Sequence, residues 1–415
     1  MSSGYFASPW PGEDGGPARL QVARSGPALD LQPGERLQCV TRNTVLSTMT
    51  VLGDPGEVYL LTHSALRANL GLATTSCVER IDPHTLQTSQ RSPRLPGGPM
   101  WPGGMAIHRN GDIYVVYGRY AHRLDRACGL KATFELPIHQ AYNSFVILDN
   151  GHIVTKNLSD AHPAVLTVLD ADTLRPACAD VPCPEPSIAR LSAVGNTVYV
   201  VGVRSIFRYH WNDAAQTLQR DPDWTWDYVG ATAQTYGWDP VIDGHNAWFM
   251  DNGLHRYRIN MLGAGVRQTP NRLLRVSLTN AQDHAALEVS GLRGGSITNP
   301  PLVDVQRRIV VGFDSANKVL RAWRLQDDQS LAPLWHKPHF GVASHLLLYP
   351  QTGELVVNDY RRLGEEVVLL DIETGQERAR VRSGGLTQGV VFPSVGWERD
   401  LYWSSMGRLA RIFVA

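Results

Sequence analysis

The chain has 415 residues, with 39 Lys and Arg against 39 Asp and Glu, 43% apolar residues and 19% charged residues. This balance excludes a strongly basic nucleic-acid clamp, whose affinity comes from clustered phosphate neutralisation. The apolar fraction excludes a long disordered chain, and no stretch approaches the roughly 18 uninterrupted apolar residues that a membrane span needs. We therefore expect a globular protein that binds neither nucleic acid nor membrane.

The start of the chain and the cysteines bear on the cellular compartment. Residues 1–16 have neither a basic patch nor an apolar run, so no signal peptide is expected. Five cysteines, an odd number in a long chain, favour a reducing compartment over a disulfide framework. Cys178 and Cys183 lack the second pair or histidine cluster that would complete a zinc site. The sequence therefore predicts free thiols and a cytoplasmic location.

A short apolar strand, a turn and a second apolar strand recur through the chain. The turns NGD, DNG and QTG predict hairpins, since Gly and Asn tolerate positive φ. The second strands start about 49 residues apart on average, which is the period of a repeat. The strand pairs occupy 48–61, 104–117, 144–156, 189–202, 240–251, 300–314, 345–359 and 390–405.

Each predicted hairpin is followed by a third strand, and seven of them also by a fourth, such as 131–137 and 377–383. Four antiparallel strands repeated at this period are typical of a β-propeller with one sheet per blade. We predict an all-β fold, a single propeller of eight four-stranded blades, with seven blades as the alternative.

The two ends of the sequence predict how the ring closes. The chain stops at Ala415, directly after the third strand of the last repeat, and an open sheet edge there would favour aggregation. Residues 35–42 (ERLQCVTR) precede the first inner strand, where an outer strand belongs. We predict that this strand closes a propeller domain of residues 35–415. Residues 1–34, with 11 Gly and Pro, would form an extended or poorly ordered tail.

The loops that precede the inner strands point at the central channel. Polar groups that converge on a channel entrance with aromatic walls make a default ligand site. Two long loops, 62–77 and 251–272, lie on the same face, and such loops are usually lids or binding loops. The residues brought to this mouth are Trp101, His139, Tyr142, Asn143, Glu185, Gln234, Tyr236, Trp238, Asp239, Asn299, His345 and Gln388.

The ends of the second strands predict a charge asymmetry at the mouth. One side would be cationic and the other acidic. The basic residues are Arg119, Lys156 and Arg204, and the acidic ones are Asp251, Asp314 and Asp359.

Each of these residues also has a structural interpretation, which stays open. An Asp at the end of a blade strand often caps the following turn, which is the alternative for Asp251, Asp314 and Asp359. His139 and His345 are as compatible with a structural hydrogen bond as with chemistry, and Glu185 is as compatible with an ion pair.

Other aromatic and histidine residues are expected to have structural or surface positions. Trp248, Trp323 and Trp403 fall in strands and are expected to pack between blades. The histidines expected at the surface are His63, His84, His162, His284, His336 and His339.

Several motifs are missing from the sequence. It contains no GxSxG elbow, GxxxxGK loop, HExxH helix or GxGxxG turn, which disfavours a serine hydrolase, a P-loop NTPase and a Rossmann dehydrogenase. Repeated WD dipeptides are also missing, which weakens a eukaryotic scaffold interpretation.

Strand pairs such as GGMAIHRNGDIYVV and YNSFVILDNGHIV resemble those of the SMP-30/gluconolactonase and strictosidine-synthase-like propellers, a superfamily of calcium-dependent lactonases and esterases. The resemblance implies a divalent cation at the channel mouth, held by Glu, Asn and Asp side chains. Such hard oxygen ligands suit Ca²⁺ or Mg²⁺. Family members usually have six blades, whereas this sequence indicates eight. The positions of matching type and place are Glu185, Asn143, Asn299 and Asp239 or Asp251.

Two functional hypotheses from different classes follow. The first is a metal-assisted hydrolase or lyase acting on a small molecule. The metal would polarise a lactone or ester carbonyl or lower the pKa of a bound water, with His345, Asp359 or His139 in acid–base roles. Its substrate-binding residues would be Trp101, Tyr142, Tyr236, Trp238, Gln388, Lys156 and Arg204.

The second hypothesis is a non-catalytic propeller that binds a small ligand or a protein on the same face. A third is a quinoprotein-like oxidoreductase, because such enzymes have eight blades and VVLLDIETGQERARV resembles one of their repeat units. The sequence leaves the oligomeric state undetermined.

Overall fold

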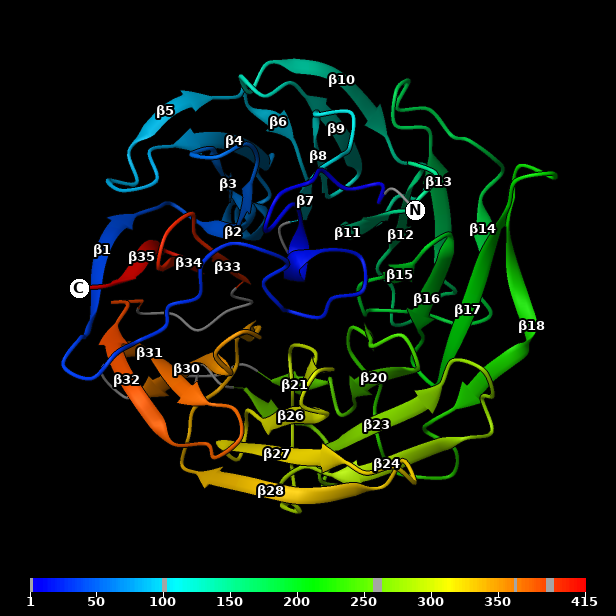
Figure 1. The fold of residues 1–415 in the computed structure, drawn as a ribbon. Helices are drawn as coiled ribbons and strands as arrows, with labels where there is room; N and C mark the ends of the chain where they lie inside the picture. The colour runs from blue at the N-terminus through cyan, green and yellow to red at the C-terminus, as the bar shows by residue number, and fades with distance from the viewer. Residues whose placement is uncertain (1–2, 99–102, 257–262, 362–363, 386–391) are drawn as a thin grey trace.

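The strands of the chain radiate as blades from a central axis (Figure 1). The computed structural model describes residues 3–98, 103–256, 263–361, 364–385 and 392–415. Within these ranges the strands form eight sheets of four or five strands and one additional two-stranded hairpin. The prediction of an eight-bladed β-propeller is confirmed. The helices of the same ranges are two short 3-10 helices, η1 (Glu13–Gly15) and η2 (Ala65–Leu70).

The first three blades follow one another along the chain, each a meander from the axis outwards. Blade 1 contains β2 (Ser47–Leu52), β3 (Val58–His63), β4 (Thr75–Ile81) and β5 (Thr88–Arg91), and β6 (Leu95–Pro96) also pairs with β4. Blade 2 contains β7 (Gly104–Ile107), β8 (Ile113–Tyr117), β9 (Tyr120–Leu124) and β10 (Leu130–Glu135). Blade 3 contains β11 (Tyr142–Ile147), β12 (Ile153–Asn157), β13 (Val165–Leu169) and β14 (Val181–Pro182).

Blades 4 to 6 repeat the pattern. Blade 4 contains β15 (Ser192–Val194), β16 (Thr197–Val201), β17 (Ser205–Asn212) and β18 (Thr217–Asp227). Blade 5 contains β19 (Val241–Ile242), β20 (Asn246–Met250), β23 (Arg272–Ser277) and β24 (His284–Glu288), and β21 (His255–Arg256) with β22 (Ala264–Gly265) forms the separate hairpin. Blade 6 contains β25 (Leu302–Asp304), β26 (Ile309–Asp314), β27 (Val319–Leu325) and β28 (Leu331–Pro338).

The last two blades bring the ends of the chain together. Blade 7 contains β29 (Leu347–Tyr349), β30 (Glu354–Arg361), β31 (Gly364–Asp371) and β32 (Glu377–Arg382). Blade 8 contains β33 (Phe392–Val395), β34 (Asp400–Ser405), β35 (Arg408–Val414) and, as its outer strand, β1 (Leu37–Asn43) from the other end of the chain.

The pairing of β1 with β35 closes the ring, as the sequence predicted. The strands are antiparallel, and their register runs from Leu37 opposite Val414 to Asn43 opposite Arg408. Just outside the strands, Arg36 and Ala415 exchange two backbone hydrogen bonds of 3.1 and 3.0 Å. The C-terminus therefore lies beside β1 (Figure 1).

The hairpin turns have the predicted conformation. Gly111, Gly151 and Gly353, in the turns NGD, DNG and QTG, have φ values of +86°, +97° and +69°. Glycine adopts this left-handed region without the steric cost that a Cβ would bring. The short turns lie on one face of the disc, called the turn side below. The loops between second and third strands lie on the other face, the loop side.

Burial along the strands explains why the sequence shows continuous apolar runs. Every residue of β8 (IYVVY) is buried, because its sheet packs between two neighbouring blades, whereas the outer strand β10 (LKATFE) is largely exposed. Trp248, Trp323 and Trp403 are at most 1% exposed and belong to apolar clusters, which confirms their predicted packing role. All five cysteines are free thiols. No helix of the described ranges has the length and apolar character of a membrane span.

Proline substitution in β1 tests the closure of the ring. Hydrogen-bonded pairs alternate in an antiparallel ladder, so the Arg36–Ala415 pair places the Val40 N–H toward β35 and the Thr41 N–H away from it. Val40→Pro should lower the free energy of unfolding by about 1–3 kcal/mol more than Thr41→Pro, because it removes a ladder bond. Chemical denaturation of both variants measures the difference. Equal losses would contradict this account of closure.

Candidate functional site

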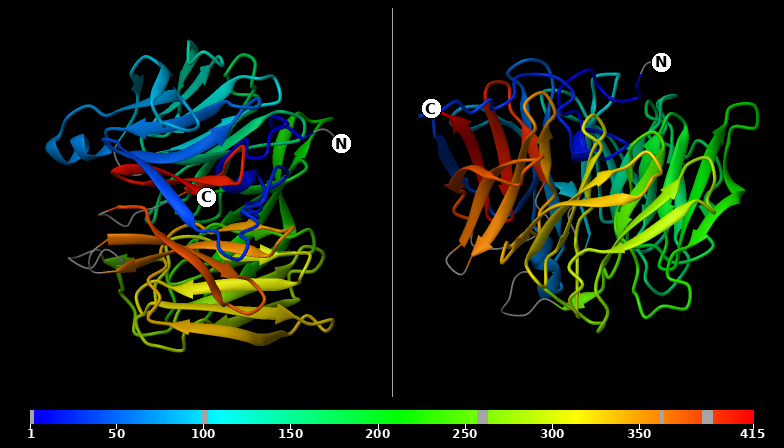
Figure 2. Two further views of the ribbon diagram at one scale, coloured as in Figure 1. Left: turned by 60° about the vertical axis from the view of Figure 1, so that its left-hand side comes forward. Right: turned by 60° about the horizontal axis from the view of Figure 1, so that its bottom comes forward.

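The N-terminal residues of the chain occupy the axis on the turn side. Figure 1 shows this segment crossing the centre of the disc, and Figure 2 shows it on the face opposite η2. The sequence indicated only an extended or poorly ordered tail for residues 1–34, but most residues between Gly4 and Ala23 are buried. We call residues 4–23 the axial segment.

Backbone hydrogen bonds hold the axial segment against the inner strands of five blades. The inner edge of each inner strand carries N–H and C=O groups that no neighbouring strand satisfies, and the segment supplies partners for them. The bonds are Phe6 N–H to Ile107 O, Leu52 N–H to Trp10 O, Ala193 N–H to Pro17 O, Ile242 N–H to Ala18 O and Leu348 N–H to Gln21 O, all between 2.8 and 2.9 Å.

Arg19 is the centre of a buried ion-pair network on the axis. Its guanidinium lies 2.7 Å from Glu13 and 2.9 Å from Asp14, and it donates to the Leu191 carbonyl and the Ser144 hydroxyl at 2.7 and 2.8 Å. Arg19 is only 1% exposed. Burial alone would lower the pKa of Arg19, but the carboxylates Glu13, Asp239 and Asp14 raise it above its ordinary value. The positive charge of Arg19 is therefore balanced by buried carboxylates.

His345, predicted as a catalytic base, joins this network through Asp14. Its Nδ1 lies 2.8 Å from the Asp14 carboxylate, its ring stacks on Phe392 with centroids 4.0 Å apart, and it is fully buried. Burial by itself would raise the pKa of Asp14, but His345 and Arg19 outweigh burial and hold it below its ordinary value. The imidazole therefore contacts the axial segment.

Asp239, a predicted metal ligand, lies in the same network. Its carboxylate accepts the backbone N–H of Arg190 at 2.6 Å and lies 3.4 Å from the Arg190 guanidinium. That guanidinium also stacks over Phe392, 4.9 Å from the ring centroid, and lies 3.7 Å from Glu13. Sequence reasoning thus found His345 and Asp239 but not Glu13, Asp14 or Arg19, which no periodic pattern singled out.

The other predicted metal ligands have protein partners of their own. Glu185 accepts the N–H groups of Arg204 and Ser205 at 2.9 and 2.8 Å, and burial raises its pKa. Asp251 binds the Arg272 guanidinium at 2.7 Å and the Arg272 N–H at 2.8 Å, and burial raises its pKa to about 6.

The two predicted asparagine ligands differ. Asn299 donates to the Ala343 carbonyl at 2.9 Å, while its Oδ1 has no partner among the described residues. Asn143 lies in β11. In the described ranges, no three His, Cys, Asp or Glu side chains form a group that could hold a metal ion. The axial divalent cation therefore stays a prediction.

The three basic residues of the predicted charge asymmetry have partners nearby. Arg119 pairs with Glu135 at 3.0 Å, and Arg204 pairs with Asp227 at 3.0 Å. Lys156 is buried and donates to the Ser187 carbonyl at 3.1 Å, and burial lowers its pKa to about 8.

The aspartates of the opposite side are likewise engaged. Asp314 accepts the N–H groups of Ser296 and Asn317, at 3.2 and 3.1 Å, as a turn-capping residue does. Asp359, predicted as catalytic, accepts the Gly341 N–H and pairs with Arg361 and Arg380, each at 2.9 Å. Burial would raise the pKa of Asp359, but these donors lower it.

The remaining predicted residues that the structure describes differ in burial. Tyr142 is fully buried, with its hydroxyl accepting the Ile138 N–H at 3.2 Å. Trp238 is 6% exposed and packs edge-on to the half-buried Tyr236 with centroids 6.5 Å apart. His139 is exposed. Trp101 and Gln388 lie outside the described residues.

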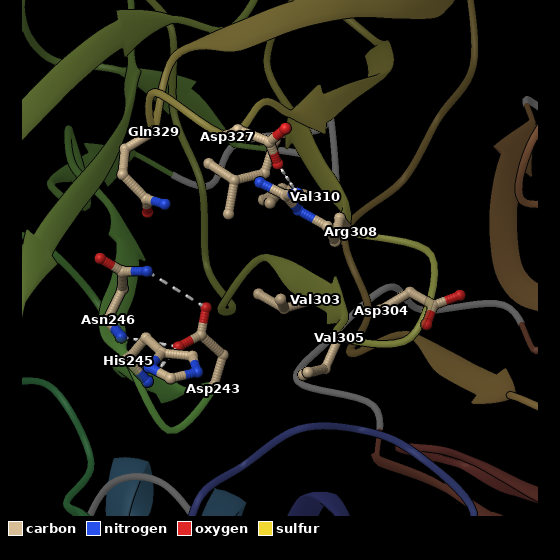
Figure 3. Close-up of a pocket in the computed structure, with 11 residues that line it drawn as sticks. Asp243, His245, Asn246, Val303, Asp304, Val305, Arg308, Val310, Asp327 and Gln329 are labelled. Carbon is tan, nitrogen blue, oxygen red and sulfur yellow. Dashed lines mark hydrogen bonds and ion pairs between the residues drawn. The ribbon is translucent and has the colours of Figure 1, made fainter.

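A pocket of about 440 Å³ lies between blades 5 and 6 on the turn side (Figure 3). Asp243 accepts the Trp248 indole N–H at 2.7 Å and the Asn246 N–H at 2.6 Å, and Arg308 pairs with Asp327. None of the described side chains that line it leaves a buried polar atom without a partner. The polar groups of this pocket are therefore explained by the fold.

Removing the charge of Arg19 tests the importance of the axial network. Arg19→Met leaves Glu13 and Asp14 buried without their guanidinium partner, and should lower the free energy of unfolding by about 3–5 kcal/mol. The matched control is Arg36→Met, an exposed arginine just before β1, which should cost less than about 1 kcal/mol. Chemical denaturation measures both, and similar losses would contradict a special role for Arg19.

The pH dependence of unfolding tests the Asp14 contacts. Because the pKa of folded Asp14 lies below the ordinary value of 3.8, its contribution to stability is present above pH 3.8 and is lost as the pH falls through the folded pKa. Asp14→Asn should therefore destabilise the protein above pH 3.8, and the deficit should shrink in more acidic solution. A deficit independent of pH, in urea titrations across this range, would contradict the assignment.

Comparison with solved structures shows the same fold at low sequence identity. BamB from Moraxella catarrhalis aligns with a TM-score of 0.62 and 14% identity over 91% of this chain and 99% of that chain. The Dos1 propeller aligns with a TM-score of 0.58 and 9% identity over 92% and 95% of the chains. The dihydro-heme d1 dehydrogenase NirN aligns with a TM-score of 0.51 and 14% identity over 88% and 73%. No protein-family model and no curated protein matches the chain. At these identities the comparisons establish the β-propeller fold alone.

Proposed function

We propose that this protein is a non-catalytic binding propeller, with its axis closed on the turn side by its own N-terminal residues. The observation that carries the proposal is the contact between Asp14 and His345, within 2.8 Å in a fully buried environment. A catalytic base needs access to a substrate proton, whereas this imidazole faces a carboxylate of the axial segment.

The predicted metal ligands support the same proposal. A catalytic metal needs ligand oxygens and an open coordination position. Glu185 and Asp251 direct both carboxylate oxygens to protein N–H groups. Asp239 likewise directs both oxygens to Arg190. These carboxylates therefore support the structure of the loops in which they lie.

The exposed apolar residues support a binding role on the loop side. Large hydrophobic side chains cluster around η2, which projects on the face opposite the axial segment (Figure 2). Grouped exposed apolar residues usually mark a binding surface, whereas scattered ones need no explanation. The cluster consists of Val45, Leu66, Leu70 and Leu72, which are 85%, 60%, 76% and 48% exposed.

Metal analysis and thermal unfolding test the proposal against the hydrolase hypothesis. The purified protein should contain no stoichiometric calcium or magnesium, and its melting temperature should be the same in calcium and in EDTA. Glu185→Gln should lower stability by about 1–3 kcal/mol in both conditions, because it weakens the acceptor of two backbone N–H groups. A stoichiometric ion whose stabilising effect disappears in Glu185→Gln would overturn the proposal in favour of a metal-dependent enzyme.

A further inference from the structure

The short helix η2 projects from blade 1 on the loop side of the disc (Figure 2). None of its residues, Ala65–Leu70, is buried, although two of them are leucines. Leu72, just after the helix, and Val45, in the link between β1 and β2, are exposed as well. An exposed cluster of large apolar side chains on a folded domain usually marks an interaction surface.

These apolar side chains border a groove. A cavity of about 540 Å³ lies between η2 and the link from β1 to β2, and its lining includes Leu66 from the helix and Val45 from the link. Leu70 and Leu72 continue the apolar surface outside the cavity. A segment of another chain that entered this groove would therefore meet apolar side chains on more than one side.

The charged side chains of the groove are almost all arginines. The four that line it are Arg42, Arg67, Arg91 and Arg94. The carboxylate in the lining is Glu79, which is buried and paired with Arg42 and Arg91. Arg94 makes no hydrogen bond or ion pair among the described residues, and Arg67 uses only its Nε, toward the Ala73 carbonyl at 3.0 Å. We call the four arginines, together with Val45, Leu66, Leu70 and Leu72, the η2 surface.

Positive charge is segregated at the η2 surface. The whole chain has equal numbers of basic and acidic residues, but the three stretches that build this surface contain no Asp or Glu. They are residues 40–52, 58–78 and 83–98. A surface of one charge sign attracts partners of the opposite sign and repels partners of its own. The charge of the η2 surface therefore favours an acidic partner.

The opposite face of blade 1 takes no part in this surface. The His63 ring points to blade 2, where it meets the Tyr117 ring edge-on with centroids 6.0 Å apart, and His63 is only 5% exposed. The sequence-based expectation that His63 lies at the surface is wrong, because blade 2 covers this face of the sheet. The η2 surface thus consists of arginines and apolar side chains. Arginine is enriched and Asp and Glu are depleted in protein–protein interfaces.

We propose that the η2 surface binds an acidic segment of a partner protein that also carries large apolar side chains. The apolar side chains of the segment pack against Val45, Leu66 and Leu70, which removes this surface from water. Its carboxylates pair with Arg67 and Arg94, whose planar donors match carboxylate oxygens. The inference names the partner class of the binding function proposed above and rests on that proposal.

The shape of the η2 surface favours a polypeptide over an anionic membrane, which also attracts arginine and leucine side chains. Val45, Leu66 and all four arginines line a cavity. A flat bilayer surface contacts a concave site poorly, whereas a single chain segment can enter it.

Selection from a phage-displayed library of random peptides tests the partner class. The library is first depleted on the variant Leu66→Ser/Leu70→Ser and then selected on the wild-type protein. The selected peptides should have a net negative charge and contain Leu, Ile, Phe or Met, because they must complement both the arginines and the leucines. No enrichment on the wild-type protein, or enrichment of peptides without net negative charge, would overturn the proposal.

Affinity measurements with the most enriched peptide locate its site. Arg67→Ala/Arg94→Ala should weaken binding about tenfold or more, and the exposed positions of both side chains mean that their loss spares the core. Added salt should weaken binding to the wild type more than binding to this variant, since salt screens the charge attraction. Arg220→Ala, an exposed arginine on β18, is the matched control and should leave affinity unchanged. Unchanged affinity in the double arginine variant would place the peptide elsewhere and overturn the proposal.

Sedimentation with vesicles that contain phosphatidylserine tests the membrane alternative. The wild-type protein should remain in the supernatant. Cosedimentation that is lost in Leu66→Ser/Leu70→Ser would show that a membrane covers the η2 surface and would overturn the proposal.

The two proposals fail in different experiments. Failure of the peptide selection refutes the acidic partner and leaves the metal and EDTA result standing. A stoichiometric catalytic metal refutes the non-catalytic function and leaves the peptide affinities standing.

Discussion

The antiparallel pairing of β1 with β35 is the interaction on which the rest of this structure depends. A propeller has no stable edge until its last blade is complete, because an unpaired outer strand exposes a row of N–H and C=O groups. Here the missing strand comes from residues 37–43, so the eighth blade is completed by hydrogen bonds between the two ends of the chain. The pairing also determines where the flanking segments lie.

The segment before β1 occupies the axis on the turn side. Its backbone satisfies the inner edges of five blades, and its charged residues meet Asp239, Arg190 and His345. A buried ion pair is weak evidence for stability, because desolvation offsets much of its attraction. The effect of these ion pairs on conformational specificity is clearer. Arg19 contacts all its partners only when the axial segment lies in this one position.

The segment after β1 forms one wall of a cavity of about 540 Å³ on blade 1. Arg42, Val45 and Leu46 lie between the closing strand and the first inner strand, facing the η2 loop across the cavity. Closure therefore shapes both the filled axis on the turn side and the open, positively charged cavity on the loop side.

The sequence by itself determined the architecture of this protein: eight repeats, the hairpin turns at Gly111, Gly151 and Gly353, and closure by residues 35–42. These features follow from local periodicity and turn chemistry, which any stretch of chain displays without reference to distant residues. Only the tertiary structure decided what the polar residues do. Asp14 and His345 are 331 positions apart in the sequence, and the residues around each of them give no indication of the contact. The same holds for His63, which the sequence placed at the surface but which is only 5% exposed in the structure. The partner of a side chain depends on packing between residues far apart in the sequence, which local periodicity does not predict.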